Sequence, residues 1–390
     1  MDKSILWLSD GAQLTTGYCT ISRKLMNYLV DYGWKVDYLS HTGNHQTFMP
    51  GLTFEDGEKL NFKIHGAGLA PYCQDLIVPK IHELKPKIFG ILLDTFMCYP
   101  WFLNLDFSPA KSLFYFPSDG GGFPVGCEQI LKKVDVPVAM SKYAQKQVKE
   151  LFNINSKYIP HAVETDVYKP LSEQEKLVLR NKWGLRGKFV IGCVARNQGR
   201  KMLDRQMLSF AKVCKEMPNA VFLMHTDKQD PASYFNFEKL INDLGIQNRV
   251  IFTGTRYFKG FDYKKMNEIY NLMDIFFLST SGEGFGIPFI EAMSAGVPVI
   301  TTDYTTAKEI IEDNNAGILV KCSDEILGTW HVNRGIMDIN EGTKALIKLY
   351  NEPLTRKEMG LNGRSAVLRD YDWRIVSKEW DKLLTEMLND

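Results

Sequence analysis

Short apolar, β-prone runs alternate with amphipathic helical patterns along the whole chain. Such runs are typical of strands buried on both faces of a parallel sheet, and their alternation with helices predicts a doubly wound α/β architecture. In the first half of the chain, the runs fall near residues 4–9, 34–40, 61–65, 87–93, 111–116 and 136–140. In the second half, they fall near residues 189–195, 219–225, 249–253, 275–279, 298–301 and 316–320.

A polar segment between the two series of runs predicts a boundary between two domains. It extends from His161 to Leu185, carries Pro170 and many charged residues, and is followed by a fresh apolar run at Phe189. At 390 residues, the chain is also longer than one hydrophobic core usually supports. The expected division is a first domain over residues 1–168, a second domain over residues 169–371 and a C-terminal helix over residues 372–390.

The segment over residues 274–302 predicts a strand, a glycine-rich loop, a helix and a second strand. Ser281–Gly286 forms the loop, Pro288 suits the first turn of the helix, and Gly296 followed by Pro298 ends the helix. In α/β folds, a loop that leads from the carboxyl end of a parallel strand into a helix is a common phosphate site. Free backbone amides and the positive end of the helix dipole meet there. The segment therefore predicts an anion site.

Two carboxylates accompany this anion site. Glu283 lies in the loop and Glu291 lies in the helix, with seven residues between them. On one continuous helix, that spacing would rotate the second side chain by roughly 80° and displace it by roughly 12 Å. Because Glu283 precedes the helix, both carboxylates can flank one extended ligand and accept hydrogen bonds from sugar or ribose hydroxyls. We expect Glu283 near the reacting end of that ligand and Glu291 near a diol, with the loop amides facing phosphate.

The same glycines also permit comparison with a dinucleotide-binding turn. They fall at positions 282, 284 and 286, whereas the G-x-G-x-x-G fingerprint requires its third glycine at the position of Ile287. The segment also lies late in the second half of the chain, not in the first strand–turn–helix unit of a domain. Both observations disfavour a dehydrogenase.

Composition and charge fit a soluble two-domain enzyme. The chain is 45% hydrophobic and 24% charged, and its 47 basic and 46 acidic residues leave a net charge of +1, which gives no general attraction to nucleic acid or to anionic membranes. No apolar stretch approaches the roughly 20 residues of a membrane span, so we expect a cytoplasmic protein whose membrane contact, if any, is peripheral. The 7 cysteines are scattered without C-x-x-C spacing, which indicates reduced thiols and no zinc site.

A cluster of basic residues follows the first strand of the second domain. Arg196, Arg200 and Lys201 lie between the run at 189–195 and an amphipathic helix. Cations at a helix start are disfavoured by the helix dipole by a few tenths of a kcal/mol, roughly, and an anionic ligand would offset that cost. Of the three, Arg200 is the residue that we expect to be only a solvated surface cation.

The stretch Glu283-GFGIPFI-Glu291, with its continuation AMSAGVPVI, resembles the E-x7-E motif of the retaining glycosyltransferases of family 4. This resemblance implies the GT-B fold, in which two Rossmann-like domains face a central cleft and a C-terminal helix crosses back to the first domain. The amphipathic segment that starts at Trp373 predicts such a helix. The resemblance also implies metal-independent and cofactor-independent transfer of a hexose, with retention, from a nucleoside-diphosphate sugar in the second domain to a sugar, lipid-linked or other hydroxyl acceptor in the first.

The resemblance implies roles for individual residues in donor binding and catalysis. Arg196 and Lys201 match the family's diphosphate clamp, and Glu291 matches its ribose ligand. Glu283 and the backbone of Gly284, Phe285 and Gly286 would lie along the sugar and the phosphates. In the first domain, Gly17 belongs to a strand-to-helix loop that would face the donor across the cleft.

The first domain departs from the family pattern at one position that matters. Where family members often carry a His-Asp pair near the donor sugar, this chain has Ser118 followed by Asp119. We expect Asp119 to contact the reacting sugar, with the alternative that it caps its own glycine turn. His161 lies in a linker that resembles the family's I-P-H-G-V-D segment, and we interpret it as a hinge residue and not as a catalyst.

Three other interpretations stay open or are disfavoured at this point. Asp370-Tyr-Asp372 spells the D-x-D metal signature of a different glycosyltransferase fold, but no strand precedes it, so we expect no metal there. A non-catalytic nucleotide-sugar-binding protein would keep the cations but could lose Glu283, whose presence favours catalysis. A GT-B-fold epimerase or phosphorylase is the third alternative, and the sequence carries no convincing signature of a pyridoxal-phosphate lysine.

Overall fold

The first half of the chain folds around a seven-stranded parallel sheet. The computed structural model describes residues 2–14, 16–43, 45–54, 57–230, 233–255 and 260–389. The strand order is β3-β2-β1-β4-β5-β6-β7. The strands are β1 (Ser4–Ser9), β2 (Lys35–Ser40), β3 (Lys63–His65), β4 (Ile88–Leu92), β5 (Lys111–Phe116), β6 (Val136–Ala139) and β7 (Lys157–Tyr158). All six strands predicted for this half are present, and β7 is additional.

Side chains of successive residues in this sheet enter two different cores. In β1, Leu6 and Leu8 pack in one hydrophobic cluster, whereas Ile5 and Trp7 pack in the other, as the period of two in a strand requires. The first cluster lies under α2 (Gln74–Leu84), α4 (Cys127–Lys133) and α5 (Lys142–Phe152), and the second lies under α1 (Gly17–Asp31). The short helix α3 (Thr95–Cys98) follows β4. This is the doubly wound arrangement that the apolar runs predict.

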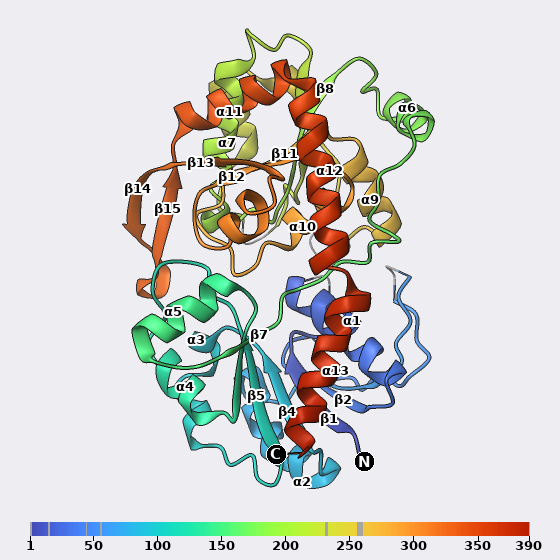
Figure 1. Ribbon diagram of the computed structural model, residues 1–390, viewed down its shortest axis with the longest axis vertical. Coiled ribbons are helices and arrows are strands. Elements are labelled where there is room, and N and C mark those ends of the chain that lie inside the picture. The colour runs from blue at the N-terminus through green and yellow to red at the C-terminus, as the bar shows by residue number, and fades with distance from the viewer. Residues whose placement is uncertain are drawn as a thin grey trace.

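The second half repeats the plan with a six-stranded sheet of order β10-β9-β8-β11-β12-β13. Its strands are β8 (Phe189–Val194), β9 (Ala220–His225), β10 (Val250–Phe252), β11 (Ile275–Leu278), β12 (Val299–Thr302) and β13 (Gly317–Val320), all of them predicted. Its helices are α6 (Glu173–Lys182), α7 (Leu203–Val213), α8 (Phe237–Leu244), α9 (Tyr263–Asn271), α10 (Ile287–Ser294), α11 (Ile339–Asn351) and α12 (Pro353–Asp370). Helix α7 packs against α11 on one face, and α10 packs against α9 and α12 on the other (Figure 1). The domain limits given above stay a prediction.

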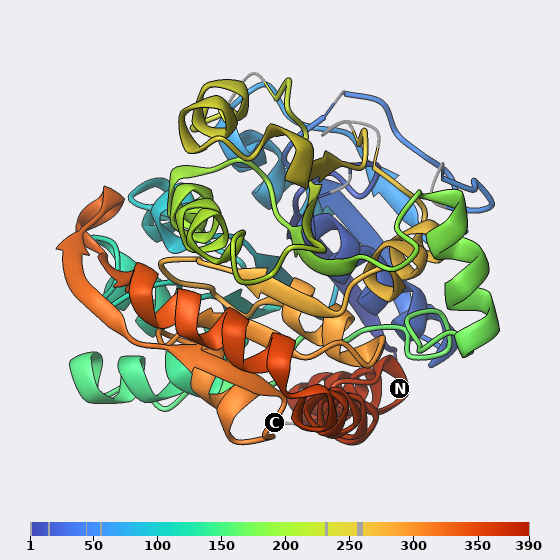
Figure 2. The same cartoon turned by 90° about the horizontal axis from the view of Figure 1, so that it is seen from above.

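A hairpin that the sequence pattern does not predict extends from the second domain. It consists of the antiparallel strands β14 (Cys322–Leu327) and β15 (Asn333–Met337) and follows β13 directly. Figures 1 and 2 show it at the edge of the molecule, on the side of the first domain's helix α5. Most of β14 is exposed, so it lacks the apolar alternation that identifies the buried strands.

The C-terminal helix α13 (Trp373–Asn389) packs on the first domain, as predicted (Figure 1). Trp380 meets Trp7 of β1 edge to face with ring centroids 6.0 Å apart, and the Trp34 indole donates a hydrogen bond of 2.7 Å to Asp381. The helix therefore completes the core on the α1 face of the first sheet. No helix in the described ranges is long and apolar enough to cross a membrane.

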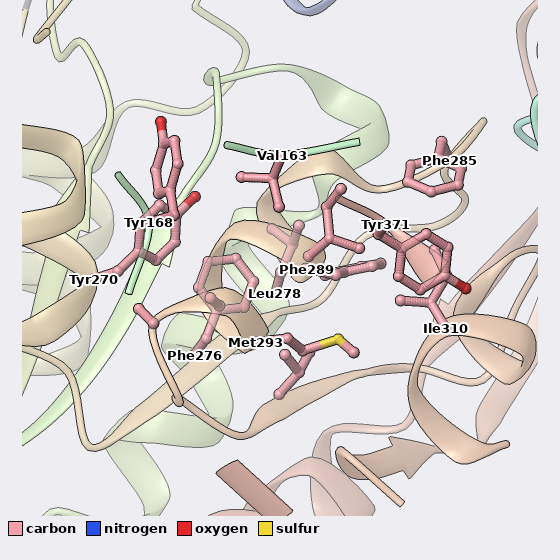
Figure 3. Packing of buried hydrophobic residues seen from close by; sticks show 14 of the residues in the cluster. Val163, Tyr168, Tyr270, Phe276, Leu278, Phe285, Phe289, Met293, Ile310 and Tyr371 are labelled. Atoms are coloured by element: carbon pink, nitrogen blue, oxygen red, sulfur yellow. The ribbon is translucent and has the colours of Figure 1, made fainter. Parts of the chain in front are cut away.

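The chain crosses between the domains twice, and the two crossings lie side by side. The Val163 amide donates to the Tyr371 carbonyl at 2.9 Å, and the Trp373 amide donates to the Val163 carbonyl at 3.4 Å. Figure 3 shows Val163, Phe285 and Tyr371 in one hydrophobic cluster with residues of α10. The crossings thus form a packed hinge directly behind the glycine-rich loop.

Candidate functional site

The candidate site lies where loops from both sheets meet at the carboxyl ends of their strands. Because β8 and β11 are neighbours in the second sheet, the basic loop after β8 touches the glycine-rich loop after β11. The Ser281 amide donates to the Arg200 carbonyl at 2.8 Å. From the first domain, the Asp119 segment after β5 reaches the same point, so close to the glycine-rich loop that a Cβ atom on Gly282 would lie 2.0 Å from the Asp119 carbonyl oxygen.

Five charged side chains of alternating sign form a row through this site, which we call the charge row. The Lys201 ammonium lies 2.5 Å from Glu283, and the Arg200 guanidinium lies 3.2 Å from the other oxygen of the same carboxylate. Arg200 also lies 3.3 Å from Asp119, and Arg334 of β15 lies 3.1 Å from the second oxygen of Asp119. With three cations and two anions, the charge row has an excess of one positive charge and favours an anionic ligand.

The two second-domain cations fix the ionisation of Glu283. Burial alone would raise the pKa of this carboxyl, but Lys201 and Arg200 outweigh burial and hold the pKa at about 2. Burial and the neighbouring Arg200 lower the pKa of Lys201. Glu283 opposes this shift, and a bound diphosphate would likewise favour the charged form of Lys201.

The amides of Gly284, Phe285 and Gly286 provide the uncharged part of an anion site. They precede α10, and within the described residues they donate to no protein acceptor. Gly286 has a φ of 104°, a left-handed conformation that glycine adopts without strain. Phe285 contributes its backbone only, because its side chain turns into the hinge, where its ring lies 4.9 Å from that of His161. Three free amides at a helix N-terminus fit the predicted phosphate site.

Gly17 brings a second helix N-terminus to this site. It is the first residue of α1, and a Cβ atom on it would lie 3.5 Å from the Cδ1 atom of Ile287 in α10. Thr16 caps α1 by accepting a hydrogen bond of 3.1 Å from the Cys19 amide. The first turns of α1 and α10 therefore face each other across the cleft.

Glu291 lies in α10, outside the charge row, and is bound to a tyrosine. The Tyr270 hydroxyl donates a hydrogen bond of 2.6 Å to its Oε2 atom. Burial raises the pKa of Glu291 to about 7, although the tyrosine hydrogen bond opposes this shift. A hydrogen bond from Tyr168 opposes the shift as well, so two tyrosines of the hydrophobic core surround this carboxyl.

The basic loop differs from its predicted arrangement. Arg196 turns toward Asp230, to which its guanidinium donates at 2.6 and 3.2 Å, and it does not join the charge row. The expectation that Arg200 is only a solvated cation is wrong, because Arg200 lies between Glu283 and Asp119. The sequence predicts where the basic loop lies, but the direction of its side chains depends on the turn Gly199–Lys201.

Asp119 lies between two arginines of the charge row, and His161 lies in the hinge. The two carboxylate oxygens of Asp119 each meet an arginine, so its carboxylate does not serve to cap its own glycine turn. The imidazole Nδ1 of His161 lies 2.8 Å from the Tyr115 hydroxyl, and burial lowers its pKa to about 3. His161 is thus a neutral residue of the hinge, in the position expected from the sequence.

Sequence reasoning missed two site residues. Arg334 lies on the unpredicted hairpin, and nothing in its local pattern marks it. Asp94 follows β4, and its carboxylate accepts a hydrogen bond of 2.9 Å from the Tyr18 hydroxyl. Burial and the nearby Asp119 raise the pKa of Asp94 to about 7. A carboxylate so soon after an apolar strand is a signal that could have identified Asp94.

The Asp370-Tyr-Asp372 segment is part of the hinge. Asp370 pairs with the adjacent Arg369, and Asp372 accepts a hydrogen bond of 2.7 Å from the Arg374 amide at the start of α13. Thr165 of the other crossing also donates to Asp372. Among the described residues, no group of three or more His, Cys, Asp or Glu side chains is arranged to hold a metal ion.

Comparison with curated proteins relates the chain to sugar-transferring enzymes. A GDP-mannose-dependent alpha-(1-6)-phosphatidylinositol monomannoside mannosyltransferase of Mycolicibacterium smegmatis is 24% identical over 261 residues, which cover 64% of this chain and 62% of the relative. A monoacylated-substrate counterpart of Corynebacterium glutamicum is 26% identical over 273 residues, which cover 66% of this chain and 65% of the relative. The chain thus spans somewhat less than two thirds of the length of these relatives.

Solved structures share the fold along the whole chain. Sucrose-phosphate synthase of Thermosynechococcus elongatus superposes with a TM-score of 0.79 at 16% identity and covers 99% of both chains. HepE of Anabaena, solved with UDP and glucose, superposes with a TM-score of 0.75 at 14% identity and covers 98% of this chain and 100% of its own. These likenesses confirm the predicted GT-B fold.

The family assignment rests on the second domain. Residues 175–365 match the family model described as glycosyl transferases group 1. This range contains the basic loop, the glycine-rich loop and α10, together with the charged residues Lys201, Glu283 and Glu291. The second domain therefore carries the sequence pattern of the glycosyl transferases group 1 family.

Proposed function

We propose that this protein transfers a hexose from a nucleoside-diphosphate sugar to an acceptor hydroxyl with retention of the anomeric configuration. The observation that carries the proposal is the charge row beside the three free amides of Gly284, Phe285 and Gly286. An excess positive charge and a helix N-terminus suit a diphosphate. The adjoining carboxylates Glu283 and Glu291 suit the hydroxyls of a sugar and a ribose.

Donor binding would rearrange the contacts of Glu283. Without a donor, this carboxylate forms ion pairs with Lys201 at 2.5 Å and with Arg200 at 3.2 Å. The two negative charges of a diphosphate would compete for the same cations, and Glu283 would then accept hydrogen bonds from the sugar instead. Stabilisation of the departing diphosphate by preplaced cations and amides is the main catalytic contribution that we assign to the second domain.

Retention follows in this proposal without an enzyme-bound intermediate. Asp119 has both carboxylate oxygens engaged by cations, and in the donor complex Glu283 would accept hydrogen bonds from the sugar, so both would be poor nucleophiles toward the anomeric carbon. The acceptor would attack from the face that the diphosphate leaves, and a phosphate oxygen would take the acceptor's proton. The first domain would bind the acceptor near Asp94 and Asp119, and domain closure would exclude water.

The donor is the first property to test, because the relatives differ in it. The names of the Mycolicibacterium and Corynebacterium relatives specify GDP-mannose, whereas HepE was solved with UDP and glucose. A thermal-shift panel with GDP-mannose, UDP-glucose, ADP-glucose and NAD compares these donors with the dehydrogenase alternative. We expect one nucleotide sugar to raise the melting temperature and NAD to leave it unchanged.

Incubation of the protein with the stabilising donor then tests catalysis itself. Release of nucleoside diphosphate, measured with and without candidate acceptors, should be lost in Lys201→Ala and kept in Lys212→Ala. Lys212 of α7 is a matched control because its ammonium lies 2.6 Å from Asn340 of α11, away from the site. Stabilisation by NAD alone would refute the proposal, and donor binding without any release would support a non-catalytic binding protein.

A further inference from the structure

The β14–β15 hairpin connects the two sides of the site. On its first-domain side, Asn333 exchanges two backbone hydrogen bonds with Gly121, at 3.0 and 2.9 Å. On its second-domain side, the Gly335 amide donates to the Ser281 carbonyl at 3.1 Å. Strand β15 therefore bridges the segment that carries Asp119 and the loop that carries Glu283.

Arg334 lies between these two attachments and grips Asp119 from the side opposite Arg200. Its guanidinium donates to the Asp119 carbonyl and lies 3.1 Å from the Asp119 carboxylate, and its side chain is only 13% exposed. The segment that carries Asp119 and strand β15 approach each other so closely that position 120 must be glycine. A Cβ atom on Gly120 would lie 2.4 Å from the Asn333 carbonyl oxygen.

The tip of the hairpin makes a third contact with the first domain. The Trp330 ring stacks on Phe96 of α3 with centroids 4.6 Å apart and an interplanar angle of 14°. Phe96 lies two residues after Asp94, so this contact borders the part of the first domain that would hold the acceptor. Figure 1 shows the hairpin descending from the second domain alongside the first.

We propose that the β14–β15 hairpin is a clasp that holds the cleft closed and that Arg334 is a positioning residue. This proposal rests on the proposed function. Arg334 holds Asp119 beside Arg200 only while the hairpin keeps its contacts with the first domain at Gly121 and Phe96. Release of the clasp frees Asp119 and admits water to the donor. The groups assigned to the diphosphate, Lys201 and the α10 amides, all belong to the second domain, so donor binding does not require the clasp.

The kinetic test compares Arg334→Ala, Arg334→Lys and Trp330→Ser with the wild type. We expect Arg334→Ala to lower kcat by about tenfold or more while the donor KM stays within about twofold, because a positioning group acts on the transition state. The ratio of donor hydrolysis to transfer should rise, and Arg334→Lys should recover part of the kcat. Trp330→Ser should raise hydrolysis through the clasp alone. Asp324→Ala, a hairpin residue whose carboxylate binds the adjacent Glu325 amide at 2.8 Å, is the matched control and should behave as wild type.

A second measurement needs no donor and separates this proposal from the proposed function. Hydrogen–deuterium exchange of the peptides that carry Gly121 and Asn333 reports the clasp directly, because their amides bond across the two domains. Protection should fall in Arg334→Ala and Trp330→Ser and persist in Asp324→Ala. Unchanged protection in both variants would overturn the clasp, and a raised donor KM with an unchanged kcat would overturn the positioning role. A wild type that binds no nucleotide sugar would instead refute the proposed function and leave the exchange result to decide the clasp.

Discussion

Glu283 is the residue on which the charges of the second domain converge. Its carboxylate meets Lys201 at 2.5 Å and Arg200 at 3.2 Å, and these contacts hold its pKa at about 2. An ion pair this buried is stable only with its partners in place, because removal of one partner leaves a charge without compensation. The site is therefore sensitive to the identity of each member of the charge row.

We predict that Arg200→Ala and Lys201→Ala each lower transfer by about two orders of magnitude or more. Loss of one preplaced donor to a transition-state anion typically costs about 2.7–4 kcal/mol. Steady-state kcat/KM with the preferred donor measures the effect, and Lys212→Ala serves as the control. A nearly wild-type Arg200→Ala would mean that Arg200 only supports Asp119. A comparable loss in Arg196→Ala would require its guanidinium to leave Asp230 when the donor binds.

Substitution of Glu283 and of Glu291 should affect different kinetic parameters. Glu283→Ala should mainly lower kcat, because its carboxylate would contact the part of the donor that changes in the reaction. Glu291→Gln should mainly raise the donor KM, because a ribose does not change. Initial rates over a range of donor concentrations separate these parameters. Identical wild-type values for both variants would remove the site assignment.

The pKa of Glu291 adds a dependence on pH. Because this pKa is raised to about 7, the carboxylate is ionised above pH 7 and takes up a proton as the pH falls through that value. A protonated carboxyl accepts hydrogen bonds less well, so donor affinity should weaken between about pH 8 and pH 6. Titration calorimetry at several pH values measures this. Asp94 and Glu309 also have pKa values of about 7, so the control is Glu291→Gln, in which the dependence assigned to Glu291 should vanish.

At the scale of elements, the sequence predicts what is buried and misses what is exposed. All twelve predicted strands are present, and most of them are apolar runs with both faces covered. The β14–β15 hairpin follows no such pattern, since it is held by contacts to a distant segment at Gly121. Arg334 could not be found for the same reason. The loop with Arg196, Arg200 and Lys201 could be located, but side-chain direction depends on a turn that the sequence does not specify.

Helix α13 should act as a structural part of the first domain. Trp380 is 1% exposed and packs edge to face on both Trp7 and Tyr115. We predict that Trp380→Ala lowers the free energy of unfolding by about 3–5 kcal/mol, the usual cost of removing a buried aromatic side chain. Urea denaturation followed by circular dichroism measures the loss. Leu368→Ala, at a position 42% exposed, should change it little, and equal effects in the two variants would contradict the packing argument.

For the whole molecule, the charge row lets us predict the effect of metal removal. With Lys201, Arg200 and a helix N-terminus available to the diphosphate, transfer should persist in excess chelator. The double variant Asp370→Asn, Asp372→Asn should keep its turnover but melt at a lower temperature, because Asp372 caps α13 and binds Thr165. Activity that chelation abolishes and magnesium or manganese restores would contradict this, as would a folded but inactive double variant.

The return of α13 to the first domain also constrains the order of folding. Trp7 and Tyr115 are fully covered only when Trp380 lies on them, and Trp380 is synthesised after the entire second domain. The apolar surface around Trp7 and Tyr115 of the nascent first domain is therefore exposed to solvent while the second domain is synthesised. We therefore expect the core of the second domain, although it comes later in the chain, to be complete before the core of the first domain.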